Sequence, residues 1–318
     1  MSNEPILVHA DHLVKEFQVK RGIVHAVSDV SFDIVKGRTL AVVGESGCGK
    51  STLGRLLLRL LEPTAGHVLY EGRDIMAMPP EELRVQRRKM QMIFQDPYAS
   101  IDPRMSVGQI IAEPLSTHRV GANKKEREDM VRALMNKVGI RPEHYSRFPH
   151  QFSGGQRQRI GIARALALNP ELIICDEPVS ALDVSIQAQI LNLLLELQDD
   201  LSLTYLFISH DLGVVRFMSS RVCVMFLGKI CELCLTGDLY DAPLHPYSKF
   251  LLSSVPKPDP TLRNVERQIL TGEVSSPLNP PKGCRFHPRC PHANDRCREE
   301  EPLLRDAGSG HMVACHLI

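Results

Sequence analysis

A glycine-rich loop at Gly44–Thr52, with the sequence GESGCGKST, constrains the fold of this 318-residue chain more than any other segment. The loop fits the pattern G-x-x-x-x-G-K-[S/T], which binds the phosphates of nucleoside triphosphates. An apolar run at 40–43 precedes it, and a helical pattern at 53–61 follows. A strand, this loop and a helix in succession surround an anion with backbone N–H groups and a positive helix end. The segment therefore predicts an α/β nucleoside triphosphatase, with Lys50 on the β- and γ-phosphates and Ser51 on Mg²⁺.

The composition is typical of a soluble globular protein, with 43% hydrophobic residues, 24% charged residues and a net charge of +1. Such a charge gives no basic field for nucleic acid. No apolar run approaches the ~20 residues that cross a bilayer, so a membrane role requires a partner. Residues 1–5 lack a basic-then-apolar signal pattern, which predicts a cytoplasmic location. In that compartment the nine cysteines favour metal binding or packing over disulfides.

The order of periodic segments predicts two domains. Short alternating segments at 6–40 indicate an antiparallel sheet, and strands are expected at 67–70 and 90–94. A helical insertion at about 97–165 follows, with a capping-box pattern at Asn123–Glu126. Strand, helix and strand patterns then occupy 172–175, 185–197 and 204–208, which predicts a parallel α/β core. Periodicity fades after about 242, so we expect an ATPase domain at 1–242 and a Pro- and Cys-rich extension at 243–318.

Two further motifs predict chemistry. The apolar strand at 172–175 ends in Asp176 and Glu177. In a phosphate-loop enzyme Asp176 would hold Mg²⁺ indirectly, and Glu177 would polarise an attacking water. The second motif is Ser153-Gly154-Gly155-Gln156, where Ser153 is a natural N-cap and the glycines let an anion approach the helix start. A second anion site is useful if two subunits face each other head to tail.

The phosphate loop, the Ser153–Gln156 motif and Asp176-Glu177 together resemble the nucleotide-binding subunit of an ATP-binding-cassette (ABC) transporter. The resemblance covers residues 5 to about 240. It implies an α/β fold of the ABC type, in which an antiparallel β subdomain and a helical insertion join a parallel α/β core. It implies catalytic roles for Glu177, His210, Gln95 and Lys50, and Mg²⁺ binding by Ser51, Gln95 and Asp176. It implies that Ser153, Gly154, Gly155 and Gln156 contact the partner's ATP and that Asp183 makes a dimer contact. The residues that it implies for binding of the chain's own ATP are Phe17, Gly44, Glu45, Ser46, Gly47, Cys48, Gly49, Lys50, Ser51 and Thr52.

Four cysteines of the tail are spaced C-x5-C-x6-C-x17-C: Cys284, Cys290, Cys297 and Cys315. Four thiolates suit an iron–sulfur cluster or a tetrahedral zinc, and a nearby histidine (287, 311 or 316) could replace a cysteine in a zinc site. The tail resembles the C-terminal extension of dipeptide and oligopeptide permease ATPases, some of which hold a [4Fe-4S] cluster. The resemblance favours iron–sulfur over zinc. Cys223, Cys231 and Cys234 are interpreted as packing residues.

The resemblance implies an ATP-hydrolysing subunit that powers import of dipeptides or oligopeptides. Its expected partners are a second, homologous but not identical ATPase, two transmembrane permease subunits and an external solute-binding protein, with no nucleic acid. The expected location is peripheral, on the cytoplasmic face of the inner membrane. Two alternatives stay open: an importer of nickel or another small solute, and a non-transport ABC ATPase that acts on DNA or ribosomes.

Overall fold

The computed structural model describes residues 4–96, 98, 100–255 and 276–318, and its chain divides into two compact units. The phosphate-loop unit comprises residues 1–35, 39–76 and 209–318, and the carboxylate unit comprises residues 36–38 and 77–208. Residues 256–275, which include Pro256, Pro258 and Pro260 of the predicted Pro- and Cys-rich extension, lie outside the described part. The C-terminal residues belong to the same unit as the N-terminal strands, and the predicted boundary at 242/243 stays a prediction.

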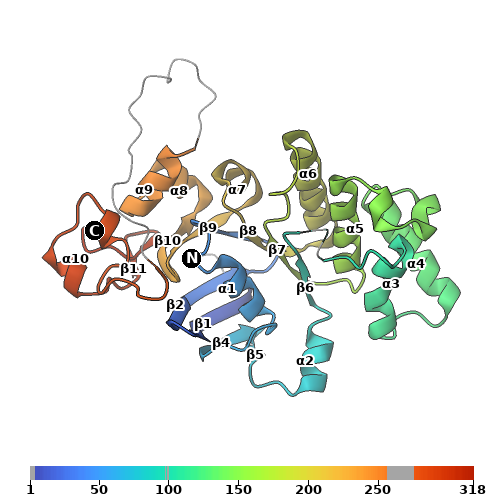
Figure 1. The fold of residues 1–318 in the computed structure, drawn as a ribbon, viewed down its shortest axis with the longest axis horizontal. Coiled ribbons are helices and arrows are strands. Elements are labelled where there is room, and N and C mark those ends of the chain that lie inside the picture. The colour runs from blue at the N-terminus through green and yellow to red at the C-terminus, as the bar shows by residue number, and fades with distance from the viewer. Residues whose placement is uncertain (1–3, 97, 99, 256–275) are drawn as a thin grey trace, which may run out of the picture. The chain divides into compact units, whose positions relative to one another are not determined.

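The N-terminal half of the phosphate-loop unit is the predicted antiparallel sheet, drawn in blue in Figure 1. In the second half of β2, buried Val30, Phe32 and Ile34 alternate with more exposed residues, as expected for a sheet with one buried face. Its strand order is β2-β1-β4-β5, with bounds Gly22–Val35, Ile6–Val19, Ala65–Tyr70 and Arg73–Asp74.

A second set of strands in this unit joins the phosphate loop to the C-terminal segment. Strand β3 (Thr39–Val43) runs parallel to β9 (Arg221–Phe226), and β10 (Lys229–Leu235) runs antiparallel to β9. Two short C-terminal strands extend this order past β10, first β12 (Met312–Val313) and then β11 (Arg305–Asp306). The helices of the unit are α1 (Lys50–Leu57), α7 (Leu212–Met218), α8 (Thr236–Asp241), α9 (Pro246–Ser253) and α10 (Asp295–Glu299).

One hydrophobic cluster ties these strands and helices together. It contains Val43 of β3, Phe226 of β9, Tyr247 of α9 and Phe286 of the C-terminal segment, all nearly inaccessible to solvent. Cys231 and Cys234 also belong to it, which confirms their predicted packing role. The cluster therefore makes the C-terminal segment part of the core that carries the phosphate loop.

The carboxylate unit contains the predicted parallel strands β6 (Met90–Ile93), β7 (Leu172–Asp176) and β8 (Thr204–Ile208). Every residue of β7 and β8 is buried, as expected for parallel strands covered on both faces. Figure 1 shows α3, α4 and α5 grouped beyond these strands. The helices of the unit are α2 (Pro80–Gln86), α3 (Val107–Thr117), α4 (Lys124–Lys137), α5 (Gly154–Leu166) and α6 (Val184–Leu201), with 3-10 turns at Pro142–Ser146 and Pro149–Gln151.

The cap of α4 confirms half of its predicted pattern. The Asn123 side chain accepts the Glu126 N–H at 2.9 Å, as an N-cap should. The Glu126 carboxylate accepts from the Ala122 N–H, one residue before the position that a capping box requires. The start of α4 was therefore predicted correctly, but the Glu126 carboxylate bonds to the N–H of Ala122 and not to that of the N-cap residue Asn123.

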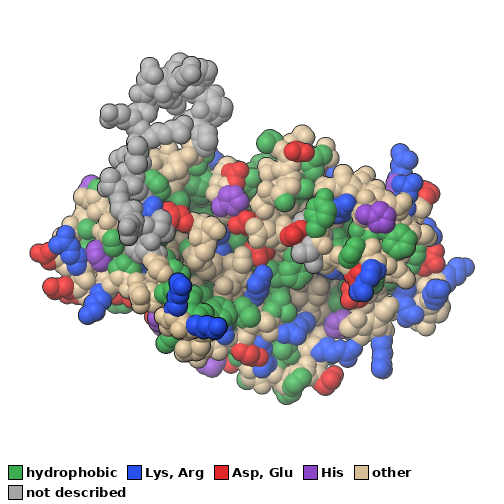
Figure 2. Space-filling view, viewed as in Figure 1, with side chains coloured by type: hydrophobic (Ala, Val, Ile, Leu, Met, Phe, Trp, Pro, Cys, Tyr) green, Lys and Arg blue, Asp and Glu red, His purple; other side chains and the backbone are tan. Residues whose placement is uncertain are grey.

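Among the residues in the described ranges, no helix is long and apolar enough to cross a bilayer. On the face shown in Figure 2, basic and acidic side chains are interspersed.

Candidate functional site

The phosphate loop has a backbone that only glycine can adopt at two positions. Gly44 and Gly49 have φ values of 151° and 107°. A Cβ atom on Gly44 would lie 2.1 Å from the Met225 carbonyl oxygen, and one on Gly49 would lie 2.2 Å from that of Ala26. The loop therefore needs glycine both for its dihedral angles and for its close approach to β9 and β2.

Lys50 lies at the start of α1, three residues before the predicted start of that helix at Leu53. Its Nζ donates to the carbonyl oxygens of Gly44 at 2.8 Å and Glu45 at 3.0 Å, and the residue is only 5% exposed. The ammonium group thus lies inside the curve of the loop. Ser51 and Thr52 follow in the first turn, half-buried, where a helix N-terminus favours an anion.

Two other predicted ATP contacts lie in the same unit. Phe17, on β1, is half-buried, and the Lys15 Nζ lies 5.0 Å from the centroid of its ring. His210 is exposed immediately before Asp211, which caps α7 by accepting the Gly213 and Val214 N–H groups. Their contacts with adenine and with the γ-phosphate stay predictions.

The carboxylate unit places Gln95 against Glu177. Asp176 ends β7 and is 2% exposed. The Gln95 Nε2 donates to the Glu177 Oε2 at 2.9 Å, which joins two residues that are 82 positions apart. Glu177 has φ 45°, in the left-handed region, and its N–H donates to the Ile208 carbonyl at 3.0 Å. Such a conformation is costly for a non-glycine residue and is characteristic of functional positions.

The Ser153–Gln156 motif is the N-terminus of α5. Ser153 accepts the Gln156 N–H at 3.3 Å and Gln156 accepts the Ser153 N–H at 3.1 Å, so the predicted N-cap is confirmed as a full capping box. A Cβ atom on Gly155 would lie 2.3 Å from Ile186 Cγ2. This glycine therefore lets the helix start pack against the first turn of α6, directly after the exposed Asp183.

The predicted Mg²⁺ ligands are of the hard-oxygen types that this ion prefers. Ser51 lies in the phosphate-loop unit, whereas Asp176 and Gln95 lie in the carboxylate unit. Because the Gln95 Nε2 donates to Glu177, its Oε1 oxygen is the atom suited to a cation.

The four tail cysteines are free thiols that influence one another. The pKa of Cys284 is raised to about 11, mainly by burial and in smaller part by Cys297, Cys315 and Cys290. The Cys284 N–H donates to the Cys297 carbonyl at 2.8 Å. A positively charged centre would favour the thiolates that burial and mutual repulsion disfavour, and thiolates are the usual ligands of iron–sulfur clusters and of structural zinc.

A different group forms the compact trio of possible metal ligands found in the described ranges: Glu232, Cys234 and His311. Glu232 is fully buried and accepts from the N–H groups of Leu244 and His245 at 2.9 Å each, and from His311 Nε2 at 2.6 Å. Two main-chain donors and a histidine thus satisfy the carboxylate without a metal. The trio therefore has a structural role: it links β10 to the start of α9 and to the residue before β12.

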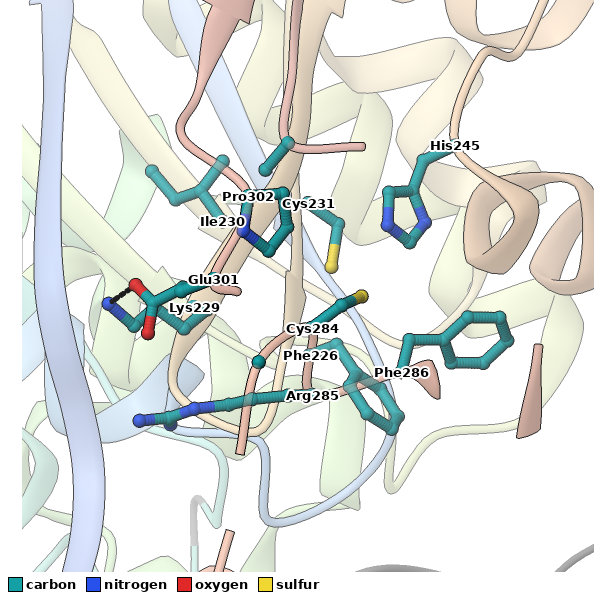
Figure 3. A pocket seen from close by; sticks show the side chains of 12 residues that line it. Phe226, Lys229, Ile230, Cys231, His245, Cys284, Arg285, Phe286, Glu301 and Pro302 are labelled. Atoms are coloured by element: carbon teal, nitrogen blue, oxygen red, sulfur yellow. Dashed lines mark hydrogen bonds and ion pairs between the residues drawn. The ribbon is translucent and has the colours of Figure 1, made fainter. Parts of the chain in front are cut away.

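A cavity of about 30 Å³ lies between β10 and the C-terminal segment. Figure 3 shows the thiols of Cys231 and Cys284 directed into it, with Phe226 and Phe286 beside them. Arg285 extends away from Phe286 along the cavity wall, and its guanidinium donates to the Leu227 carbonyl. The cavity is therefore apolar on one side and lined by thiols in its middle.

Sequence reasoning missed two residues that contact the phosphate loop. The Tyr247 hydroxyl accepts the Glu45 N–H at 2.9 Å, and the Arg289 NH1 donates to both Glu45 carboxylate oxygens at 3.0 and 2.9 Å. Neither Tyr247 nor Arg289 was assigned a role from sequence. The contacts join positions more than 200 residues apart, which no local pattern reports.

Comparison with known proteins agrees with this geometry. Residues 27–180 match the family described as "ABC transporter", and residues 231–297 match "Oligopeptide/dipeptide transporter, C-terminal region". The chain is 57% identical to the oligopeptide transport ATP-binding protein AppF of Bacillus subtilis, over 95% of this chain and 92% of the relative. It is 53% identical to the probable peptide ABC transporter ATP-binding protein y4tS of Sinorhizobium fredii, over 98% of this chain and 90% of the relative.

Solved structures show the same fold. A dimeric ATP-binding cassette in a post-hydrolysis state, bound to ADP and Pi, is 28% identical with a TM-score of 0.66, covering 72% of this chain and 98% of that one. The cbiO1 protein of Clostridium perfringens, part of an ABC transporter complex, is 26% identical with a TM-score of 0.66, covering 75% of this chain and 92% of that one. On its motifs, its fold and these identities, the chain belongs to the family of ATP-binding subunits of ABC transporters.

Proposed function

We propose that this chain hydrolyses ATP to drive the import of dipeptides or oligopeptides through a membrane permease. The observation that carries the peptide assignment is the C-terminal region at 231–297, which matches that of oligopeptide and dipeptide transporters. The 57% identity to an oligopeptide transport ATP-binding protein over nearly the whole chain supports the same solute class.

In the proposed mechanism the carboxylate unit activates the attacking water. Glu177 polarises it, and Gln95, hydrogen-bonded to Glu177, orients it and relays the presence of the γ-phosphate. In the phosphate-loop unit Lys50 and the loop amides offset the charge that develops on the phosphates, and His210 holds the γ-phosphate. Ser51, Asp176 and Gln95 would hold Mg²⁺, which would supply further charge neutralisation when bound.

The N-terminus of α5 supports a dimeric ATPase. Its capped, glycine-rich start is suited to an anion, which we assign to ATP held by a partner cassette. Asp183, exposed at the start of α6 next to this motif, would lie in the same interface. We expect a homologous partner ATPase, two permease subunits, an external solute-binding protein, and a peripheral position at the cytoplasmic face of the inner membrane. ATP binding would close the dimer and hydrolysis would reopen it.

We also propose that Cys284, Cys290, Cys297 and Cys315 hold a [4Fe-4S] cluster. The mutual effect of these thiols on their pKa values supports their convergence, while the histidines available to a zinc site have other partners. His311 contacts Glu232, and His287 and His316 each contact a main-chain carbonyl oxygen. When bound, the cluster would cross-link the C-terminal segment. Anaerobically purified protein should absorb near ~400 nm and release acid-labile sulfide; protein lacking both and carrying zinc would contradict this proposal.

The catalytic assignment is tested with Glu177→Gln and a matched control. Glu171 also borders β7, at the opposite end, where it pairs with Lys36 and Lys89 at 2.9 Å each. Glu177→Gln should retain ATP affinity and reduce turnover by ~10²-fold or more, the scale of a lost general base. Glu171→Gln should retain both. Normal turnover in Glu177→Gln would place the base elsewhere.

The partners are tested by purifying tagged Glu177→Gln protein from membranes in mild detergent with ATP and Mg²⁺. Recovery of two permease subunits and a second ATPase is the expected result. Recovery of ribosomes or DNA instead would contradict a role in transport.

A further inference from the structure

Two residues from the C-terminal part of the chain (243–255 and 276–318) hydrogen-bond to the same residue of the phosphate loop, Glu45. Tyr247, at the start of α9, accepts the Glu45 N–H at 2.9 Å. Arg289, at the end of the 3-10 turn His287–Arg289, donates to both carboxylate oxygens of Glu45. The backbone and the side chain of one loop residue are therefore held by residues from outside the ATPase core predicted from sequence.

Both holding groups are fixed by packing. Tyr247 is fully buried, and its ring centroid lies 4.7 Å from that of Phe226 and 5.3 Å from that of Phe286. The Arg289 side chain is only 9% exposed and lies over the Phe250 ring, 5.9 Å from its centroid. Because both side chains are confined by packing, they lose little further entropy when they bind the loop. The Arg289 charge is also poorly screened by water.

Glu45 in turn sets the part of the loop that Lys50 contacts. Its carbonyl oxygen accepts from the Lys50 Nζ at 3.0 Å and from the Cys48 N–H at 3.3 Å. A shift of Glu45 would therefore move the acceptor of the ammonium group that is expected to meet the β- and γ-phosphates. The contacts of Tyr247 and Arg289 with Glu45 therefore affect the position of Lys50 through Glu45.

We propose that Tyr247 and Arg289 are positioning residues for ATP, which keep the phosphate loop in its nucleotide-binding conformation. On this proposal, the C-terminal segment contributes to ATP binding by positioning the phosphate loop. The inference rests on the proposed ATPase function and adds residues to it.

The test measures the ATP Kd of the full chain by calorimetry, with kcat and KM of its ATPase activity. Tyr247→Phe keeps the ring packing and leaves the Glu45 N–H without its acceptor. It should raise Kd and KM about three- to tenfold, the range for one lost hydrogen bond, with kcat within about twofold of wild type. Arg289→Gln should raise both about tenfold or more, because it removes a charged pair from a shielded site, and Arg289→Lys should recover part of the loss.

Two matched controls separate positioning from stability. Tyr205→Phe removes a buried hydroxyl bond to the Leu194 carbonyl, in the carboxylate unit, and Arg285→Gln removes a guanidinium from the same C-terminal loop as Arg289. Both should leave the ATP Kd unchanged even if they lower the urea midpoint. In a double-mutant cycle, Glu45→Gln should add no loss to Arg289→Gln, because both remove the same pair.

The outcomes are distinct. Wild-type affinity in Tyr247→Phe and Arg289→Gln, or equal losses in the control variants, would overturn the positioning role while leaving the ATPase intact. A wild-type chain that fails to bind ATP would overturn the proposed function itself.

Discussion

Replacing Gly155 by alanine tests the packing at the start of α5. The added Cβ would lie 2.3 Å from Ile186 Cγ2, well inside van der Waals contact, while Ile186 Cβ would be at an ordinary 3.7 Å. Overpacking of this kind costs about 1–3 kcal/mol, and we expect a loss of unfolding free energy in that range. The helix start and the first turn of α6 would separate, so ATPase activity should fall as well.

The structure supplies both a rescue and a control for this substitution. Ile186→Ala removes Cγ2, so the double variant should recover at least about 1 kcal/mol relative to the sum of the single changes. A Cβ atom added to Gly161, on the same helix, would have nothing within 4 Å, and Gly161→Ala should stabilise by about 0.5–1 kcal/mol through its helix propensity. Urea unfolding of the four variants measures these values. A Gly155→Ala protein as stable as wild type, or one that Ile186→Ala does not relieve, would refute the argument.

Three further predictions concern the phosphate-loop unit. Gly44→Ala should abolish measurable ATP binding in calorimetry, because its Cβ would meet the Met225 carbonyl at 2.1 Å at a φ of 151°; retained affinity would contradict the loop geometry. Burial lowers the pKa of His245 to about 4, against a smaller opposing effect of Glu232, so the folded state binds the proton less tightly than the unfolded chain. Stability should therefore decrease as pH falls from about 6.5 to about 4, and His245→Asn, which keeps a cap acceptor, should flatten the pH dependence of the urea midpoint. Cys48 lies in the loop but is only 4% exposed, and burial raises the pKa of its thiol. Iodoacetamide should therefore alkylate Cys48 far more slowly than it alkylates the thiol of free glutathione. Equal alkylation rates, measured by mass spectrometry, would show that the loop opens.

Local patterns predicted those parts of the site that local chemistry determines. The phosphate loop, the Ser153 cap and the buried strand that ends at Asp176 were all placed from contiguous residues, because caps and short strands depend on neighbours in sequence. Helix α9 was missed although Pro246 occupies its first turn, the usual position for proline, since eight residues give little periodicity.

Contacts between distant residues could not be predicted in this way. Glu177 was assigned from the strand-end motif and Gln95 from the family resemblance, and only the structure shows their hydrogen bond. The left-handed backbone of Glu177 has no sequence signal, because most residues with such angles are glycine or asparagine. The contacts of Tyr247 and Arg289 with Glu45 depend on tertiary packing, which no local pattern in the C-terminal sequence predicts.

Peptide uptake measures the central claim most directly. Right-side-out membrane vesicles would be prepared from cells that lack the chromosomal copy and express either the wild-type chain or Glu177→Gln. They would be loaded with ATP and Mg²⁺ and supplied with the solute-binding protein outside. Wild type should accumulate a labelled dipeptide or oligopeptide, and Glu177→Gln should not, while Glu171→Gln behaves as wild type. Peptide uptake that is independent of the chain, or ATP-driven accumulation of nickel in place of peptide, would contradict the account.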